Sequence, residues 1–146
     1  MMSGSELGQE AIGLINRLAT IMVVATVDED GSPRTAPFGW VYAKDSRTLR
    51  FSTSRGHDTY KNIVRDGRVM VCLMEEGNTA ISIKGNARVY KERLESVSSH
   101  IAIVEIDITN IKNDVTRVAS VISGIKCEID ERYVEMTEDV YTEMMR

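Results

Sequence analysis

The 146-residue chain contains few of the residues that build cross-links, rigid turns or metal sites. It has two cysteines, two prolines and two histidines, and aromatic residues make up 5% of it. Cys72 and Cys127 lie far apart and form neither a CxxC pair nor a zinc-binding pattern. We therefore expect reduced thiols and no metal. Only two prolines beside ten glycines argue against a disordered or fibrous protein.

Long apolar runs and a cationic excess are also missing. No apolar run approaches the ~20 residues that span a bilayer, and no cationic region precedes an apolar one near the N-terminus. Eighteen lysines and arginines against 22 aspartates and glutamates give a net charge of −4, which offers no broad cationic surface to nucleic acid. We expect a soluble cytoplasmic protein without membrane or nucleic-acid partners. Its composition fits one domain over residues 1–146 that buries roughly two thirds of its unfolded surface.

Hydrophobic periodicity predicts a mainly β chain. The first two β-rich segments flank an acidic turn at residues 28–32 and form a hairpin. Short links between the first five segments favour antiparallel meandering over βαβ crossovers. A small closed barrel would leave no exposed edge. The predicted strands are residues 20–27, 34–42, 49–53, 68–74, 79–90 and 101–111.

Helical spacing is found at both ends of the chain. A first helix, capped at Ser3, is expected to cover an open end of the barrel with the apolar stripe Leu7, Ala11, Leu14, Ile15 and Leu18. A membrane-surface helix is disfavoured because its polar face carries almost no basic residues. We also predict a helical turn at residues 91–98, a helix over 115–125 and a final helix that begins at Thr137.

Polar chemistry is concentrated in residues 49–68. Three hydroxyl side chains follow one another at residues 52–54, and Arg55 and Lys61 add positive charge. The NH groups that open a following helix favour an anion. Together these features predict a phosphate site. The alternative is an ordinary surface turn rich in Ser, Thr, Gly and Asp.

The second predicted strand contains an opening for a flat ligand. Pro37 lacks an NH group and Gly39 lacks a side chain, so this strand should be irregular or lie at an edge. Trp40 packs on the ligand, on a partner subunit or in the core, and a lone tryptophan in a strand is more often core. For His57 and His100, the groups that titrate near neutral pH, a structural or solvent role is favoured over catalysis.

The order and spacing of three segments carry a family resemblance: ATVDEDGSPRTAPFGWV, LRFSTSRGHDTYKNIVRDGRVMV and ISIKGNARVY. Over about Leu14 to Tyr90 the chain resembles the pyridoxamine 5′-phosphate oxidase-like FMN-binding split-barrel superfamily. The resemblance implies a mainly β fold with flanking helices, built as a six-stranded antiparallel split β-barrel. It also implies FMN as cofactor, a small-molecule substrate and a homodimer with the cofactor groove between its subunits.

Matched by position, the second strand corresponds to the family strand whose backbone faces the flavin ring, and residues 57–62 correspond to the phosphate loop and helix start. Thr59 stands where many members have lysine, so other cations would supply the charge. Thr79 and Ala80 stand where the oxidase proper has arginine and glutamine. The cofactor-binding residues that we predict are Arg34, Pro37, Phe38, Gly39, Trp40, Phe51, Ser52, Thr53, Arg55, His57, Thr59, Lys61 and Asn62.

Three functions are compatible with the sequence. The leading hypothesis is an FMN-dependent oxidoreductase that acts on an unknown small substrate, with no catalytic residue identified. The second keeps the fold but makes it a binding or carrier protein for haem or a deazaflavin, because fold alone does not fix function. The third is a cofactor-free dimeric interaction protein.

Overall fold

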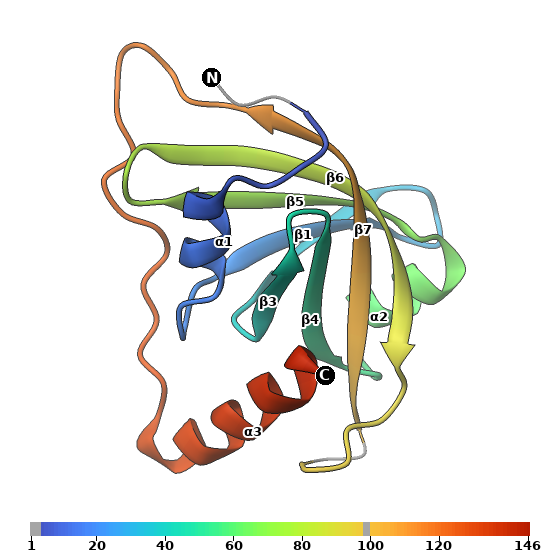
Figure 1. Ribbon diagram of the computed structural model, residues 1–146. Helices are drawn as coiled ribbons and strands as arrows, with labels where there is room; N and C mark the ends of the chain where they lie inside the picture. Colours follow the sequence, from blue (N-terminus) through green and yellow to red (C-terminus); the bar gives the residue numbers. More distant parts are fainter. Residues whose placement is uncertain (1–3, 98–99) are drawn as a thin grey trace.

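The computed structural model describes residues 4–97 and 100–146. In these ranges seven strands form one antiparallel sheet, in the order β2-β1-β5-β6-β7-β4-β3 (Figure 1). The strands are β1 (Met22–Val27), β2 (Pro33–Phe38), β3 (Val41–Asp45), β4 (Thr48–Ser54), β5 (Arg68–Glu75), β6 (Thr79–Lys91) and β7 (Ile101–Asn113). The helices are α1 (Gln9–Ile15), α2 (Asp58–Arg65), the 3₁₀ turn η1 (Glu131–Tyr133) and α3 (Val134–Met145).

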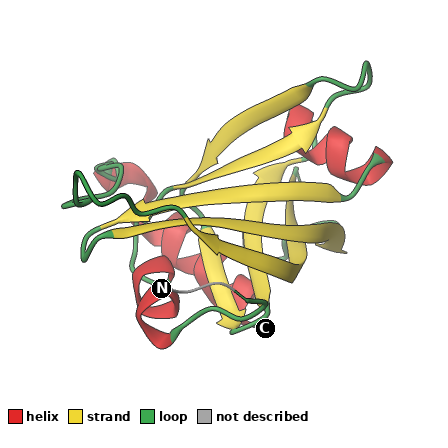
Figure 2. Ribbon diagram, turned by 90° about the horizontal axis from the view of Figure 1, so that it is seen from above, coloured by secondary structure: helices red, strands yellow, loops and turns green. Residues whose placement is uncertain are grey.

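The sheet curls into a barrel that its hydrogen bonds do not close. Phe38 of β2 packs against Phe51 of β4 with ring centroids 4.7 Å apart, although these strands lie near opposite ends of the sheet order. The strands β2 and β3 remain as its two edges, and the curvature is visible from above in Figure 2. The prediction of a split β-barrel is confirmed, whereas that of a closed barrel is wrong because the two edges do not pair.

The sheet has one more strand than we predicted. The segment 34–42, expected to be one strand, bends at Gly39 and Trp40 and becomes β2 and β3. The bend carries the chain from one edge of the sheet to the other. It runs close to Ile21, whose Cδ1 would lie 3.1 Å from a Cβ at Gly39. A tight passage of this kind favours glycine.

Helix α1 contributes to the barrel core as predicted, over a shorter stretch. Leu7, Ala11 and Ile15 are buried in the core inside the barrel. The helix ends at Ile15, so Leu18 lies beyond it and is 49% exposed. It begins at Gln9, and the predicted cap at Ser3 lies outside the described residues.

Helix α3 makes a second apolar core outside the barrel. Side chains alternate along a strand, so residues 101–106 of β7 are all buried only because both of its faces are covered. Ile103 packs with Val140 and Met144 of α3, while Val104 faces the barrel core. Figure 1 shows α3 lying across β3 and β4. The final helix is therefore confirmed, with its start at Val134.

Two predicted helical segments are not helical. Residues 92–97 form bends after β6, and Ser98 lies outside the described residues. Residues 114–130 form an irregular strap instead of a helix over 115–125. Asn78 and Val121 fasten this strap to the β5–β6 turn through two 3.0 Å hydrogen bonds. The apolar stripe fails as a helix because nothing covers it: Val118 is 93% exposed and Ile122 85%.

Candidate functional site

The predicted phosphate loop connects β4 to α2 and is ordered by its own polar groups. The Ser54 hydroxyl accepts a hydrogen bond from the Gly56 NH (3.2 Å), and the Ser54 carbonyl accepts one from the His57 NH (3.1 Å). His57 then caps α2, because its Nδ1 accepts from the Thr59 NH at 3.1 Å. A side-chain acceptor at this position satisfies an NH group that the helix leaves unpaired. His57 therefore has the structural role that we favoured, and an incoming anion would compete with its imidazole.

Two predicted site residues carry buried hydroxyl groups without a partner. Ser52 and Thr59 are 3% and 0% exposed, and neither Ser52 Oγ nor Thr59 Oγ1 has a hydrogen bond within the described part of the chain. Leaving such a group unsatisfied costs about 1–3 kcal/mol. The neighbouring Thr53 hydroxyl makes only a 3.4 Å contact with the Ser54 carbonyl. Ser52 lies opposite Ile103 on the face of β4 that α3 covers, whereas Thr59 lies in the first turn of α2. At Thr59, an unsatisfied donor is a feature that a bound ligand would explain.

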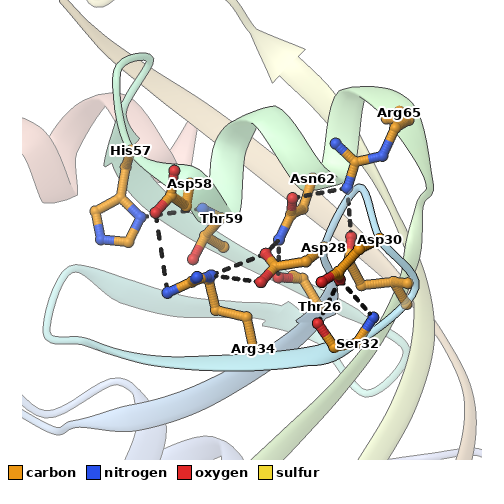
Figure 3. A network of polar contacts seen from close by, with 11 residues as sticks. Thr26, Asp28, Asp30, Ser32, Arg34, His57, Asp58, Thr59, Asn62 and Arg65 are labelled. Atoms are coloured by element: carbon orange, nitrogen blue, oxygen red, sulfur yellow. Dashed lines mark hydrogen bonds and ion pairs between the residues drawn. The ribbon is translucent and has the colours of Figure 1, made fainter.

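Arg34 reaches the start of α2 from the adjacent strand β2. Its Nε lies 2.8 and 3.0 Å from the two carboxylate oxygens of Asp28, and its Nη1 lies 3.9 Å from Asp58 (Figure 3). The hydrogen bond from Arg34, followed by one from Asn62, lowers the pKa of Asp28. The same bond to Asp28 raises the pKa of Arg34. Part of the positive charge expected here is thus already matched by carboxylates.

Of the other predicted cations, Lys61 lies near Arg34 and Arg55 does not. Lys61 is exposed and lines the same pocket of about 350 Å³ as Arg34. Arg55 is half-buried and donates from Nη1 to the Glu92 carbonyl at 2.8 Å. The pocket brings together Arg34, Lys61 and Asn62, whereas Arg55 is turned toward the end of β6.

Asn62 has a structural task. Its Nδ2 donates to Thr26 Oγ1 (3.0 Å) and to Asp28 (2.8 Å), and its Oδ1 accepts from Arg65 (2.8 Å). Arg65 also donates to the Val27 carbonyl at 2.6 Å. These bonds fasten α2 to the β1–β2 hairpin, and they leave the Asn62 amide little capacity for a ligand.

The predicted ring-binding residues divide between the core, the edge and α3. Phe38 and Phe51 point into the barrel core, and His57 lies 5.5 Å from the Phe38 ring. Pro37 is exposed on β2. Gly39 accepts a hydrogen bond at its carbonyl from the Tyr141 hydroxyl (3.0 Å).

Trp40 is also covered by α3. It donates from Nε1 to Thr137 Oγ1 at 3.3 Å and packs against the outer core. The prediction that Trp40 lies in the barrel core is wrong, because the chain bends here and its side chain is half-buried against the outer core under α3. Helix α3 thus lies over the bend that the resemblance assigned to the flavin ring.

Asp28 and Asp58 are functional candidates that sequence reasoning missed. The sequence predicts only an acidic turn at residues 28–32, and nothing local distinguishes Asp28 from its neighbours. A signal exists only across the predicted hairpin, because the register of β1 and β2 places residues 27 and 33 opposite each other. That pairing brings the turn close to Arg34 but does not reveal α2.

Other chemistry is not found among residues 4–97 and 100–146. They hold no cluster of three potential metal ligands, and Cys72 and Cys127 are free thiols. No helix in these ranges combines the length and hydrophobicity needed to cross a bilayer.

The chain matches the family model of pyridoxamine 5′-phosphate oxidase over residues 10–119, a span that contains every strand of the barrel. This protein belongs to the pyridoxamine 5′-phosphate oxidase family. The family resemblance predicted from the order of the three segments is confirmed. Among curated proteins, none matches the sequence.

Solved structures of family-like proteins share its fold. A Lactobacillus delbrueckii protein, provisionally assigned as a pyridoxamine 5′-phosphate oxidase, is 22% identical; the match covers 74% of this chain and 94% of that chain, with a TM-score of 0.63. An F420 reductase is 17% identical; the match covers 73% of this chain and 98% of that chain, with a TM-score of 0.59. An FMN-binding protein from Syntrophomonas wolfei is 13% identical; the match covers 74% of this chain and 86% of that chain, with a TM-score of 0.57. At these identities the likeness shows the fold.

Proposed function

We propose that this protein binds FMN and is an oxidoreductase that acts on a small molecule. The observation that carries the proposal is the buried, unpartnered hydroxyl of Thr59 in the first turn of α2, at the predicted phosphate loop. Phosphate oxygens are strong acceptors that the Thr59 hydroxyl could satisfy. Bound FMN would supply hydride or electron transfer, while the protein provides placement and exclusion of water.

The residues on β2 and α2 fit such a ligand. Arg34 and Lys61 are two of the three cations in one pocket, which also contains four carboxylates. Residues 33, 35 and 37 of β2 lie on alternate positions, so their backbone groups point to the same side of the strand. Pro33 and Pro37 have no NH group to donate to β1, which indicates that this side is the free edge. Thr35 therefore directs its NH and carbonyl toward the free edge. The carbonyls of Pro33 and Pro37 have the same parity, so the edge presents one NH group and three carbonyls, which suits the hydrogen-bonding rim of a flavin ring.

Thr59→Val tests the proposal with an isosteric change. If the hydroxyl binds the phosphate, FMN should bind about 10–150-fold more weakly, since a lost hydrogen bond to a charged group costs about 1.5–3 kcal/mol. The cofactor-free protein should be at least as stable as before, because an unsatisfied buried hydroxyl is removed. Visible absorption of the purified protein, FMN titration by fluorescence and urea denaturation measure these effects.

Thr109→Val is the matched control, since Thr109 is an exposed residue at the far end of β7 whose hydroxyl donates to the Lys84 carbonyl. It should leave FMN affinity unchanged. The proposal fails if the wild-type protein shows neither flavin absorbance nor FMN binding. Unchanged FMN affinity in a folded Thr59→Val variant would show that the phosphate lies elsewhere.

A homodimer with the cofactor groove between its subunits is part of the proposal. It is supported by an uncovered apolar face on the barrel, where Met70, Cys72 and Met74 of β5 are exposed beside half-buried Val23 and Ala25 of β1. Contiguous apolar patches on a sheet commonly mark protein interfaces. The two prolines of β2 disfavour the alternative of edge-to-edge pairing.

A second candidate is a deazaflavin-binding protein. It is favoured by Thr59, which stands where many family members have a lysine, and by the carboxylates of Asp28 and Asp58 beside Arg34. The fold similarity to an F420 reductase is consistent with it. Mass spectrometry of the ligand released from the protein as purified separates the two candidates.

A further inference from the structure

The guanidinium of Arg34 is held from one side. Its Nε contacts both oxygens of Asp28 at 2.8 and 3.0 Å, whereas its Nη1 lies 3.9 Å from Asp58 Oδ2, beyond hydrogen-bond range. Figure 3 shows the terminal nitrogens directed toward the first turn of α2. Arg34 therefore presents its terminal NH groups at the helix start, where fork-like donors and helix NH groups both favour an anion.

Asp28 is itself fixed, so it orients Arg34 firmly. The Asn62 Nδ2 donates to Asp28 at 2.8 Å, and the same amide group donates to Thr26 at 3.0 Å. Thr26 and Asn62 are 2% and 4% exposed, so this support is buried. Asp28 consequently acts as a positioning residue for the guanidinium.

Asp58 faces the remaining side of Arg34. Its side chain is 62% exposed and stands in the first turn of α2, next to the buried hydroxyl of Thr59. The side chains of Asp58, Thr59 and Arg34 converge in Figure 3. A phosphate placed against the Arg34 NH groups would also be next to the Asp58 carboxylate. The two groups are both negatively charged, so they would repel each other.

The surrounding pocket reinforces this effect. Its cations are Arg34, Lys61 and Arg65, and its carboxylates are Asp28, Glu29, Asp30 and Asp58. Carboxylates therefore outnumber cations by one. A dianionic phosphate enters against an unfavourable local charge unless one carboxylate is displaced.

We propose that Asp58 is a built-in competitor for Arg34 that holds down the affinity of this pocket for a phosphate group. This role rests on the proposed function, because the pocket is the one assigned to the cofactor phosphate. Asp58 sets specificity by charge: it lowers the advantage of a phosphorylated flavin over the same flavin without phosphate. When a phosphate binds, Asp58 swings into solvent and its place at the Arg34 NH groups is taken by phosphate oxygens.

The test compares Asp58→Asn with wild type, both as the full chain, in titrations with three ligands: FMN, riboflavin and inorganic phosphate. Flavin fluorescence gives the affinities for FMN and for riboflavin, which lacks the phosphate. Heteronuclear NMR of the Arg34 Nε–H and Thr59 amide signals follows binding of inorganic phosphate. We expect Asp58→Asn to bind FMN and inorganic phosphate about fivefold more tightly, the size of one exposed charge interaction, with riboflavin affinity unchanged.

Two further variants separate competition from simple charge removal. Glu29→Gln removes a charge from the same pocket, but within the described residues Glu29 makes no hydrogen bond or ion pair with Arg34. It should therefore change phosphate affinity by less than about twofold. In an Arg34→Gln background, Asp58→Asn should lose most of its effect. Arg34 is 45% exposed, so the glutamine variant should fold.

The outcomes also separate this inference from the proposed function. Tighter phosphate binding by Asp58→Asn that disappears without Arg34 supports the inference, even if neither protein binds flavin; in that case only the proposed function falls. Unchanged phosphate affinity, an equal gain in Glu29→Gln or an equal gain without Arg34 overturns the inference, whether or not FMN binds.

Discussion

Arg50 shows how a single charged side chain can be buried when it has an ion pair, a carbonyl acceptor and an aromatic ring as partners. It exposes 1% of its side chain, pairs through Nε with Glu105 Oε2 at 2.8 Å and donates from Nη1 to the Met144 carbonyl at 2.7 Å. Its guanidinium also lies 3.9 Å from the centre of the Tyr90 ring. The Met144 carbonyl is at the C-terminal end of α3, where a cation is favoured by the helix dipole.

Arg50→Ala should lower the free energy of unfolding by about 3–5 kcal/mol, because it leaves a buried carboxylate and a helix-end carbonyl without this partner. Urea denaturation followed by tryptophan fluorescence measures the loss. Arg47→Ala, at an exposed arginine in the preceding turn, is the control and should change stability by less than about 0.5 kcal/mol. Equal midpoints for the two variants would contradict the account of Arg50.

At the scale of a whole element, α3 is held more by packing than by its own sequence. Val140 and Met144 are fully buried one turn apart, and Tyr141 and Thr137 reach back to the bend between β2 and β3. The helix carries Glu135 in its first turn and no basic residue in its last. The docking contacts with β3 and β4 therefore contribute most to its stability.

Met144→Ala should destabilise the protein by about 2–4 kcal/mol, since it deletes a fully buried side chain and leaves a cavity. Met145→Ala is a matched control one position along, where the side chain is 54% exposed, and it should cost less than about 0.5 kcal/mol. Thermal unfolding of the two variants gives the comparison. A similar loss in both would mean that α3 is not docked as described.

For the molecule as a whole, the uncovered face of β5 is the feature that bears on assembly. Helices lie against the barrel elsewhere, while Met70 and Met74 remain 40% and 47% exposed. Replacing both by lysine should convert the proposed dimer to a monomer, because charges at the centre of an interface are costly to desolvate. Analytical ultracentrifugation over a range of protein concentrations measures the change.

Val118→Lys provides the control for that experiment. Val118 is 93% exposed on the strap of residues 114–130, so the substitution adds the same charge at an apolar position outside the proposed interface. It should leave the association state unchanged. A wild-type protein that is monomeric throughout, or a double-lysine variant that still dimerises, would refute the proposed interface.

The extent of agreement between sequence and structure also depends on scale. The strands β1, β4, β5, β6 and β7 follow the predicted segments closely, because alternation of buried and exposed residues is a local property of extended chain. The helix predicted over 115–125 had the right spacing but no surface to cover, so it does not form. The bend at Gly39 was visible as irregularity, although its consequence, a separate strand at the opposite edge, was not.

The candidate site divides in the same way. Hydroxyls, a glycine and cations around residues 52–61 marked the loop from sequence alone. The pairing of Arg34 with Asp28 and its approach to Asp58 required the hairpin and α2 to be packed together.

The sequence by itself determined a mainly antiparallel β-barrel with a polar loop after the third predicted strand, residues 49–53, since side-chain periodicity and turn chemistry act over a few neighbouring residues. Only the tertiary structure decided where charges meet and which surfaces are covered. Arg50 pairs with Glu105, which lies 55 residues later in the chain, and Trp40 donates a hydrogen bond to Thr137, which lies 97 residues later. Such contacts depend on how the elements pack together, which no local pattern encodes.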